Sequence, residues 1–163
     1  MSATDDFLDN NRRYAKDFSN GDLPPSPATK VAIVACMDAR MHVGAMLGLA
    51  EGDAHVIRNA GGIVSDDVIR SLMVSQCLLG TREIMLIHHT ECALFHTSQE
   101  TLRSAVCEQT GVRKGVPVVS CCALEESLIR SVERIRSSSL IPHKDSIRCF
   151  VYEIETGLLQ EIV

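Results

Sequence analysis

Residues 31–36 form an unbroken apolar run, Val-Ala-Ile-Val-Ala-Cys, in which three of the six side chains are β-branched. A strand with one face in water alternates apolar and polar residues, whereas an unbroken run is typical of a parallel strand that is covered on both faces. Further strand patterns occur at residues 54–58, 84–89 and 147–154. The chain is therefore expected to build a central sheet with helices above and below it.

Helical patterns separate these runs. The clearest begins after Ser65, a good N-cap residue, has Asp66 and Asp67 in its first turn, and runs to a C-cap signal at Gly80. Other helices are predicted at residues 41–49, 98–109 and 123–136, and residues 111–122 fit either a strand or a packed loop. Alternating strands and helices predict an α/β fold with a mainly parallel sheet, for which we expect the strand order 2-1-3-4.

The N-terminal segment forms a separate arm in this interpretation. Residues 5–18 have the pattern of a modest amphipathic helix with aromatic side chains, and the Pro-containing segment 20–27 interrupts regular structure. The arm, residues 1–22, is too short for a core of its own and should pack on the body or on a neighbouring subunit. At 163 residues the chain should form a single domain, residues 1–163.

Composition excludes several classes of function. The net charge of -5 gives no basic surface for nucleic acid or for an anionic membrane. There is no apolar run long enough to span a bilayer, and the acidic first residues do not resemble a leader peptide, so we expect a cytoplasmic protein. The seven cysteines are an odd number without the spacing of a disulfide-rich scaffold. They therefore direct attention to metal binding or to a reactive thiol.

Two strand ends carry the residues with chemical potential. The first strand ends in Cys36-x-Asp38-x-Arg40, and the third in His89-x-x-Cys92. Ligands in open α/β sheets bind beyond the carboxyl ends of the strands, where the winding reverses. If these strands are neighbours there, Cys36, His89 and Cys92 supply three ligands of a zinc site whose fourth position stays open.

Adjacent strand residues face opposite sides, so only one of His88 and His89 can face Cys36. The spacing to Cys92 favours His89, and His88 is then predicted to be a hydrogen-bonded core residue.

These motifs, with Arg58-Asn59-Ala60-Gly61 between them, resemble the β-class carbonic anhydrases, particularly the short archaeal and mycobacterial type. The resemblance implies one zinc ion per subunit held by Cys36, His89 and Cys92, with Asp38 and Arg40 as the catalytic dyad. It implies reversible hydration of CO2 to bicarbonate by zinc-bound hydroxide. It also implies a homodimer or a higher even oligomer, with active sites near the subunit interface.

The roles of the dyad also have a physical basis. Two thiolates cancel the charge of zinc, so water bound there benefits from a nearby acceptor, which Asp38 can supply. The same carboxylate would block the site if it bound the metal. Arg40 can hold it away through a two-point ion pair, which makes the dyad a gate.

Other functions remain open on the sequence alone. Where the family usually has Gly after the second cysteine, this chain has Ala93, followed by apolar Leu94 and Phe95. A more apolar entrance could favour carbonyl sulfide or carbon disulfide, so a carbonyl sulfide hydrolase using the same zinc site is the main alternative. A non-catalytic zinc-stabilised protein and a thiol redox protein are the others.

The remaining cysteines, methionines and histidines receive ordinary structural interpretations. Cysteines and methionines in helix or strand patterns, or near the expected site, are predicted to be core residues: Cys77, Cys107, Cys149, Met37, Met41 and Met46. Cys121 and Cys122 are taken as thiols without a role. Gly61 and Gly62 should allow close approach of the backbone beside the metal site. Four histidines are assigned to the surface or to the support of the site, the third also being a candidate proton relay: His42, His55, His96 and His143.

Overall fold

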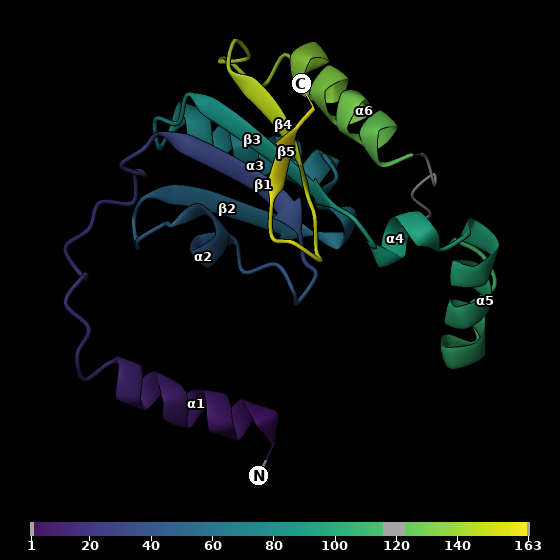
Figure 1. Ribbon diagram of the computed structural model, residues 1–163, viewed down its shortest axis with the longest axis horizontal. Coiled ribbons are helices and arrows are strands. Elements are labelled where there is room, and N and C mark those ends of the chain that lie inside the picture. The colour runs from purple at the N-terminus through teal and green to yellow at the C-terminus, as the bar shows by residue number, and fades with distance from the viewer. Residues whose placement is uncertain (1, 116–122, 163) are drawn as a thin grey trace.

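The computed structural model describes residues 2–115 and 123–162, and a five-stranded sheet lies at its centre (Figure 1). Its strands are β1 (Val31–Cys36), β2 (Ala54–Asn59), β3 (Glu83–His89), β4 (Ile147–Tyr152) and β5 (Leu159–Glu161), in the order β2-β1-β3-β4-β5. The first four strands are parallel, and β5 pairs with β4 in the antiparallel sense. The predicted α/β class and the order 2-1-3-4 are confirmed. The short strand β5 extends that order and was not expected.

The described helices are α1 (Ala3–Tyr14), α2 (Val43–Leu47), α3 (Asp66–Cys77), α4 (Ala93–His96), α5 (Gln99–Thr110) and α6 (Leu124–Ser137), with a 3-10 turn, η1 (Ala60–Gly62). The Ser65 hydroxyl caps α3 by accepting a hydrogen bond from Val68 N at 3.3 Å. Helix α3 ends at Cys77, so the prediction that it continues to Gly80 was wrong. Gly80, with φ 74°, lies in the connection to β3 instead.

The two faces of the sheet bury different sets of side chains. On β1, Ala32 and Val34 face a core that includes residues of α3 and α6, and Ile33 and Ala35 face a second core beside α2 and α4. Successive residues of β1 thus face two different apolar cores, which explains why the run 31–36 lacks polar positions. The second core contains Cys36 and Cys92, so it forms the floor of the candidate site.

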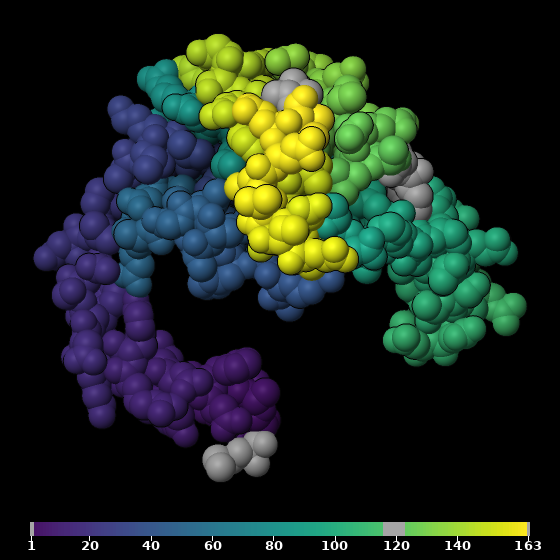
Figure 2. All heavy atoms as spheres, in the orientation of Figure 1, coloured from purple at the N-terminus to yellow at the C-terminus, as the bar shows by residue number. Residues whose placement is uncertain are grey.

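Helix α1 lies apart from the sheet at the end of an extended linker, shown in purple in Figures 1 and 2. None of its residues is buried, and its apolar side chains, such as Phe7 and Leu8, are exposed. Near its end, Tyr14 donates a hydrogen bond to Glu51 on the body. Within the described part of the chain, no helix combines the length and the apolar character needed to cross a membrane.

Predictions about individual core residues had mixed outcomes. Cys149 and Met41 are buried as expected, but Cys77 is exposed because the buried face of α3 passes through positions 68, 72 and 76. Met37 was also wrongly assigned to the core: it is 64% exposed, in the turn beyond β1. Cys107 is only partly buried. The predictions for residues 116–122, including Cys121 and Cys122, lie outside the described residues.

Candidate metal centre

The carboxyl ends of β1 and β3 meet at the reversal of the sheet's winding. Strand β1 pairs with β2 on one side and with β3 on the other. The chain first adds β2 on one side of β1 and then crosses over to add β3 on the other side, so the direction of winding reverses between β1 and β3. Cys36 is the last residue of β1, and His89 is the last residue of β3. Three residues after His89, Cys92 is the N-cap of α4. Topology alone therefore brings residues from distant parts of the sequence to one edge.

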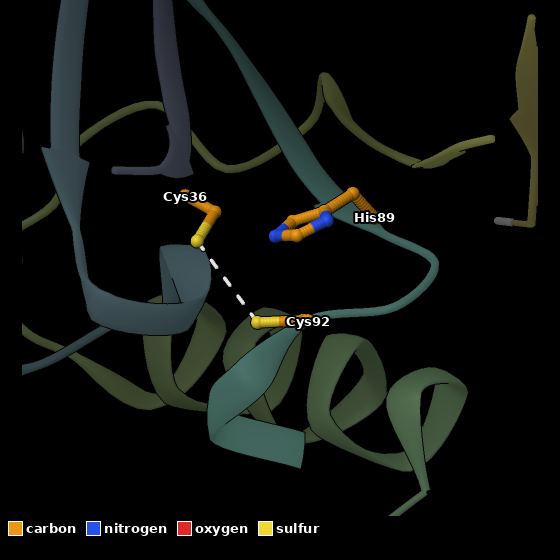
Figure 3. A group of neighbouring side chains, drawn as sticks. All are labelled: Cys36, His89 and Cys92. Atoms are coloured by element: carbon orange, nitrogen blue, oxygen red, sulfur yellow. Dashed lines mark hydrogen bonds between the residues drawn. The ribbon is translucent and has the colours of Figure 1, made fainter. Parts of the chain in front are cut away.

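Cys36, His89 and Cys92 form one buried cluster, whose side chains point toward a common centre (Figure 3). One potential ligand atom from each residue lies within 4.8 Å of the others, and the two sulfur atoms are 4.0 Å apart. Both cysteines are free, and a disulfide would need about 2.05 Å between the sulfurs. A tetrahedral zinc ion bound to both sulfurs at about 2.3 Å would place them about 3.8 Å apart, close to the separation seen.

The imidazole of His89 is oriented for metal binding. Its Nδ1 donates a hydrogen bond to the carbonyl oxygen of Thr90 at 2.8 Å, which fixes the proton on Nδ1 because a carbonyl only accepts. Its Nε2 therefore carries the lone pair, and this buried atom has no hydrogen-bond partner in the described structure. Burial also lowers the pKa of His89, so the neutral form that binds metals is favoured.

The two thiols require a cation to be held together as thiolates. Burial raises the pKa of Cys92, and the neighbouring Cys36 raises it further. A divalent cation would remove this cost by neutralising both sulfurs. Two thiolates and one imidazole whose Nε2 has no hydrogen-bond partner fit the donor set of zinc.

Asp38 lies beside this cluster and is held by Arg40. Arg40 Nε donates to Asp38 Oδ1 at 3.0 Å and Nη2 donates to Oδ2 at 2.8 Å, and the backbone N–H of Arg40 also donates to Oδ1 at 2.9 Å. These bonds hold the pKa of Asp38 well below its usual range, so the carboxylate is ionised. Its Oδ2 lies 3.8 Å from Nε2 of His89. Arg40 Nη2 also donates to the carbonyl of Glu91 at 3.1 Å. This bond links the Asp38–Arg40 pair to residues 90–91, the loop between His89 and Cys92, which we call the ligand loop.

Gly61 and Gly62 pack directly against the segments that carry the cluster. A Cβ atom on Gly62 would lie 2.8 Å from Cys36 N and 3.0 Å from Ile87 O, and one on Gly61 would lie 2.6 Å from Leu94 Cδ2. The contacts of Gly62 agree with the prediction of close backbone approach, whereas the close neighbour of Gly61 is the side chain of Leu94. Turn η1 is therefore wedged between the end of β1, strand β3 and helix α4.

His88 faces away from the cluster, as the alternation along β3 requires. It is fully buried, donates from Nδ1 to the carbonyl of Leu124 at 3.4 Å, and its ring lies 5.2 Å from the ring of Phe95. Burial lowers its pKa to about 4. The prediction of a hydrogen-bonded core histidine is confirmed.

The other four histidines lie outside the cluster, and they differ in surroundings. His42 and His96 are exposed, with His96 Nε2 3.9 Å from a carboxylate oxygen of Glu91. His55 Nδ1 is 2.8 Å from the hydroxyl of Ser75, and the backbone of His143 exchanges two hydrogen bonds with the Gln76 amide. The relay role considered for His96 stays a prediction.

Two supporting residues were missed by the sequence analysis. Arg58 donates to the carbonyls of Cys36 and Asp38, and Thr90 ties the ligand loop to the C-terminal region by accepting from Ile154 N at 3.0 Å. Arg58 lies within a motif that the sequence analysis singled out, but its side-chain partners depend on the pairing of β1 with β2. Thr90 carried no signal beyond its place between His89 and Cys92.

Comparisons with known proteins agree with this geometry. The family model described as carbonic anhydrase matches residues 31–120. The chain is 47% identical over 162 residues to Beta-carbonic anhydrase 1 of Mycobacterium tuberculosis, covering 99% of each protein. It is 34% identical over 148 residues to a carbon disulfide hydrolase of Acidithiobacillus thiooxidans, covering 78% of this chain and 74% of the relative. The crystal structure of carbonic anhydrase from Streptococcus mutans matches with a TM-score of 0.93 at 40% identity, covering 100% of this chain and 99% of that chain.

Proposed function

The chain belongs to the β-carbonic anhydrase family, and we propose that it catalyses the reversible hydration of CO2 to bicarbonate and a proton at the cluster of Cys36, His89 and Cys92. The observation that carries this proposal is the buried, unpartnered Nε2 of His89 beside two thiols and an ionised carboxylate. Such an arrangement combines a soft-metal donor set with a hydrogen-bond acceptor for the reacting water.

Cys36, His89 and Cys92 would hold one zinc ion per subunit. When bound, zinc supplies Lewis acidity, which makes the hydroxide nucleophile for CO2 available near neutral pH. The chain's own contribution is to fix the ligands. The Thr90 carbonyl keeps the His89 lone pair on Nε2, and the second core keeps both sulfurs away from bulk solvent.

Asp38 and Arg40 act together as the catalytic dyad in this proposal. The ionised Asp38 accepts a hydrogen bond from the reacting water and orients it. Arg40 holds both carboxylate oxygens, which restrains Asp38 from occupying the position that the water needs. The bond from Arg40 to the Glu91 carbonyl fixes the dyad relative to the ligand loop. The dyad thus orients the reacting water and also keeps the water position of the metal site free.

CO2 is a better candidate substrate than its sulfur analogues. The sulfur alternative rested on an entrance made apolar by Leu94 and Phe95, but both side chains are partly buried against the second core. Leu94 packs on Gly61, and Phe95 packs on the ring of His88. These contacts give the two residues a packing role. Similarity to the carbonic anhydrase of M. tuberculosis also exceeds that to the carbon disulfide hydrolase of A. thiooxidans.

One preparation of the full chain tests these alternatives. Zinc content is measured by elemental analysis, CO2 hydration by stopped-flow with a pH indicator, and carbonyl sulfide hydrolysis by release of H2S. We expect one zinc per chain and CO2 hydration well above carbonyl sulfide turnover. A reversed preference would move the assignment to a carbonyl sulfide hydrolase. Zinc without activity at any pH would indicate a non-catalytic protein, and activity that survives metal removal would indicate thiol chemistry.

We also propose that the protein forms a homodimer in which the arm packs on the second copy. The support is that α1 has no buried residue and that its apolar side chains, with those of the linker, are exposed: Phe7, Leu8, Tyr14 and Phe18. Truncation after Leu23 should shift the assembly toward monomer in sedimentation velocity. A truncated chain that remains a dimer of unchanged thermal stability would contradict this proposal.

A further inference from the structure

Arg58 binds the turn that carries the first cysteine and the carboxylate. From β2, its Nε donates to the carbonyl of Cys36 at 2.8 Å, and its Nη2 donates to the carbonyl of Asp38 at 2.7 Å. The parallel register pairs Arg58 with Ala35 on β1, so the side chain extends forward over the next three residues of its neighbour. One guanidinium therefore spans the residues on both sides of Met37.

The same strand supplies a third bond to this turn. Met37 N donates to the carbonyl of Asn59 at 2.9 Å. Asn59 is itself fixed, because its side-chain amide donates to the Ile63 carbonyl at 2.8 Å and accepts from Ile63 N at 3.0 Å. The backbone from Cys36 to Asp38 is consequently held at three consecutive residues by a braced segment of β2 and η1.

These bonds matter because Asp38 lies beyond the end of β1, outside the regular ladder of hydrogen bonds. Two carbonyls separated by one residue need two donors in a fixed relation, which the planar guanidinium fork supplies and a single ammonium does not. This one turn carries residues of both parts of the site, because Cys36 belongs to the cluster and Asp38 belongs to the dyad.

We infer that Arg58 is a positioning residue, which fixes the Asp38 carboxylate relative to the Cys36 sulfur by clamping the two carbonyls. Only the expected effect on CO2 hydration rests on the proposed function; the expected effect on metal binding does not. Arg58 is an exposed residue that binds backbone oxygens, so its removal should leave the fold intact. Its loss should instead loosen the metal site and the dyad together.

The test compares three full-length variants with the wild-type chain. Arg58→Met removes both donors at similar side-chain length, and Arg58→Lys keeps the charge without the fork. Arg70→Met is the matched control, because it removes the same charge from an exposed arginine whose partner is Asp67 on its own helix. Each protein is stripped of metal and titrated with Co²⁺, whose thiolate charge-transfer and d–d bands report affinity and coordination geometry. Steady-state CO2 hydration and urea unfolding of the metal-free protein complete the set.

For Arg58→Met we expect Co²⁺ affinity and kcat each to fall about 10-fold to 100-fold, the usual effect of losing a group that orients a metal site. The d–d bands should change, KM for CO2 should stay close to wild type, and the urea midpoint should move little. Arg58→Lys should recover only part of the loss, and Arg70→Met should match wild type.

Wild-type Co²⁺ spectra, affinity and kcat in Arg58→Met would overturn the inference, and full recovery by Lys would show that charge, not the clamp, is what matters. A parallel loss in Arg70→Met would assign the effect to net charge. Absence of CO2 hydration in the wild-type chain would contradict the proposed function, while the Co²⁺ spectra would still decide the role of Arg58.

Discussion

Replacing Gly62 with alanine should damage the metal site through a backbone contact that no side chain can relieve. Gly62 has φ 64°, and an added Cβ would lie 2.8 Å from Cys36 N, 2.9 Å from Ala35 C and 3.0 Å from Ile87 O. All three are backbone atoms, and they belong to β1 and β3, which pair with each other. The new methyl group can be accommodated only if turn η1 moves away from these strands or the strands themselves shift.

The expected cost has two parts. Alanine in the left-handed region costs roughly 1–2 kcal/mol, and forcing a methyl group into a packed interior costs roughly 1–3 kcal/mol more. The total for Gly62→Ala is therefore about 2–5 kcal/mol of unfolding free energy. Gly80 provides a matched control, since it has φ 74° but no heavy atom within 4 Å of an added Cβ. Gly80→Ala should show the conformational part alone.

Urea unfolding of both metal-free variants measures these energies, and Co²⁺ titration measures the effect on the cluster. We expect Gly62→Ala to be less stable than Gly80→Ala by roughly 1–3 kcal/mol and to bind Co²⁺ more weakly than wild type. Gly80→Ala should bind Co²⁺ normally. Equal stability of the two variants within about 0.5 kcal/mol, together with unchanged Co²⁺ binding, would refute the role of the wedged turn.

Four further predictions concern the cluster, the dyad and the C-terminal strands. Cys36→Ser and Cys92→Ser should each lose zinc and CO2 hydration, as judged by elemental analysis and stopped-flow; a variant that retains both would contradict the three-ligand site. Asp38→Ala should keep zinc but lose roughly 10²-fold to 10⁴-fold in kcat, the usual range for a proton-handling side chain. Removing zinc with a chelator should lower the thermal midpoint, because a ligand present at about 1,000 times its Kd stabilises the folded state by about 4 kcal/mol. Hydrogen bonds from Arg148 lower the pKa of Glu161, so this ion pair stabilises the fold at pH values above the ordinary carboxyl pKa, and the stabilisation is lost as the pH falls. The loss of unfolding free energy on acidification, measured by urea titration, should therefore be smaller in Glu161→Gln than in the wild-type chain.

Much of the fold could be predicted because local patterns are sufficient for it. The unbroken run at residues 31–36 indicated a doubly covered strand, and Ser65 indicated the start of α3 by supplying an oxygen to unpaired N–H groups. Failures occurred where local patterns carry little information. Helix α4 and strand β5 have only four and three residues, which is too short for a periodic pattern, and α3 ends at Cys77, before the glycine signal at Gly80.

Exposure of single residues was harder to predict for a related reason. Met37 and Cys77 have apolar side chains, yet both are exposed because their positions relative to the sheet are fixed by a turn and by the rotation of a helix. Apolar residue types are buried more often than polar ones, but which positions face the core depends on the tertiary structure.

For the candidate site, the sequence by itself determined the chemistry on offer: the two thiols, the imidazole, and an acid with an arginine two residues later, placed at the ends of recognisable strands. Only the tertiary structure decided that these groups converge, that the Thr90 carbonyl leaves the lone pair of His89 on Nε2, and that Arg58 and Gly62 brace Cys36. The physical reason is that donor identity and strand periodicity are local properties of the chain. Distances between atoms far apart in sequence depend instead on strand register and on backbone contacts formed only when the sheet assembles.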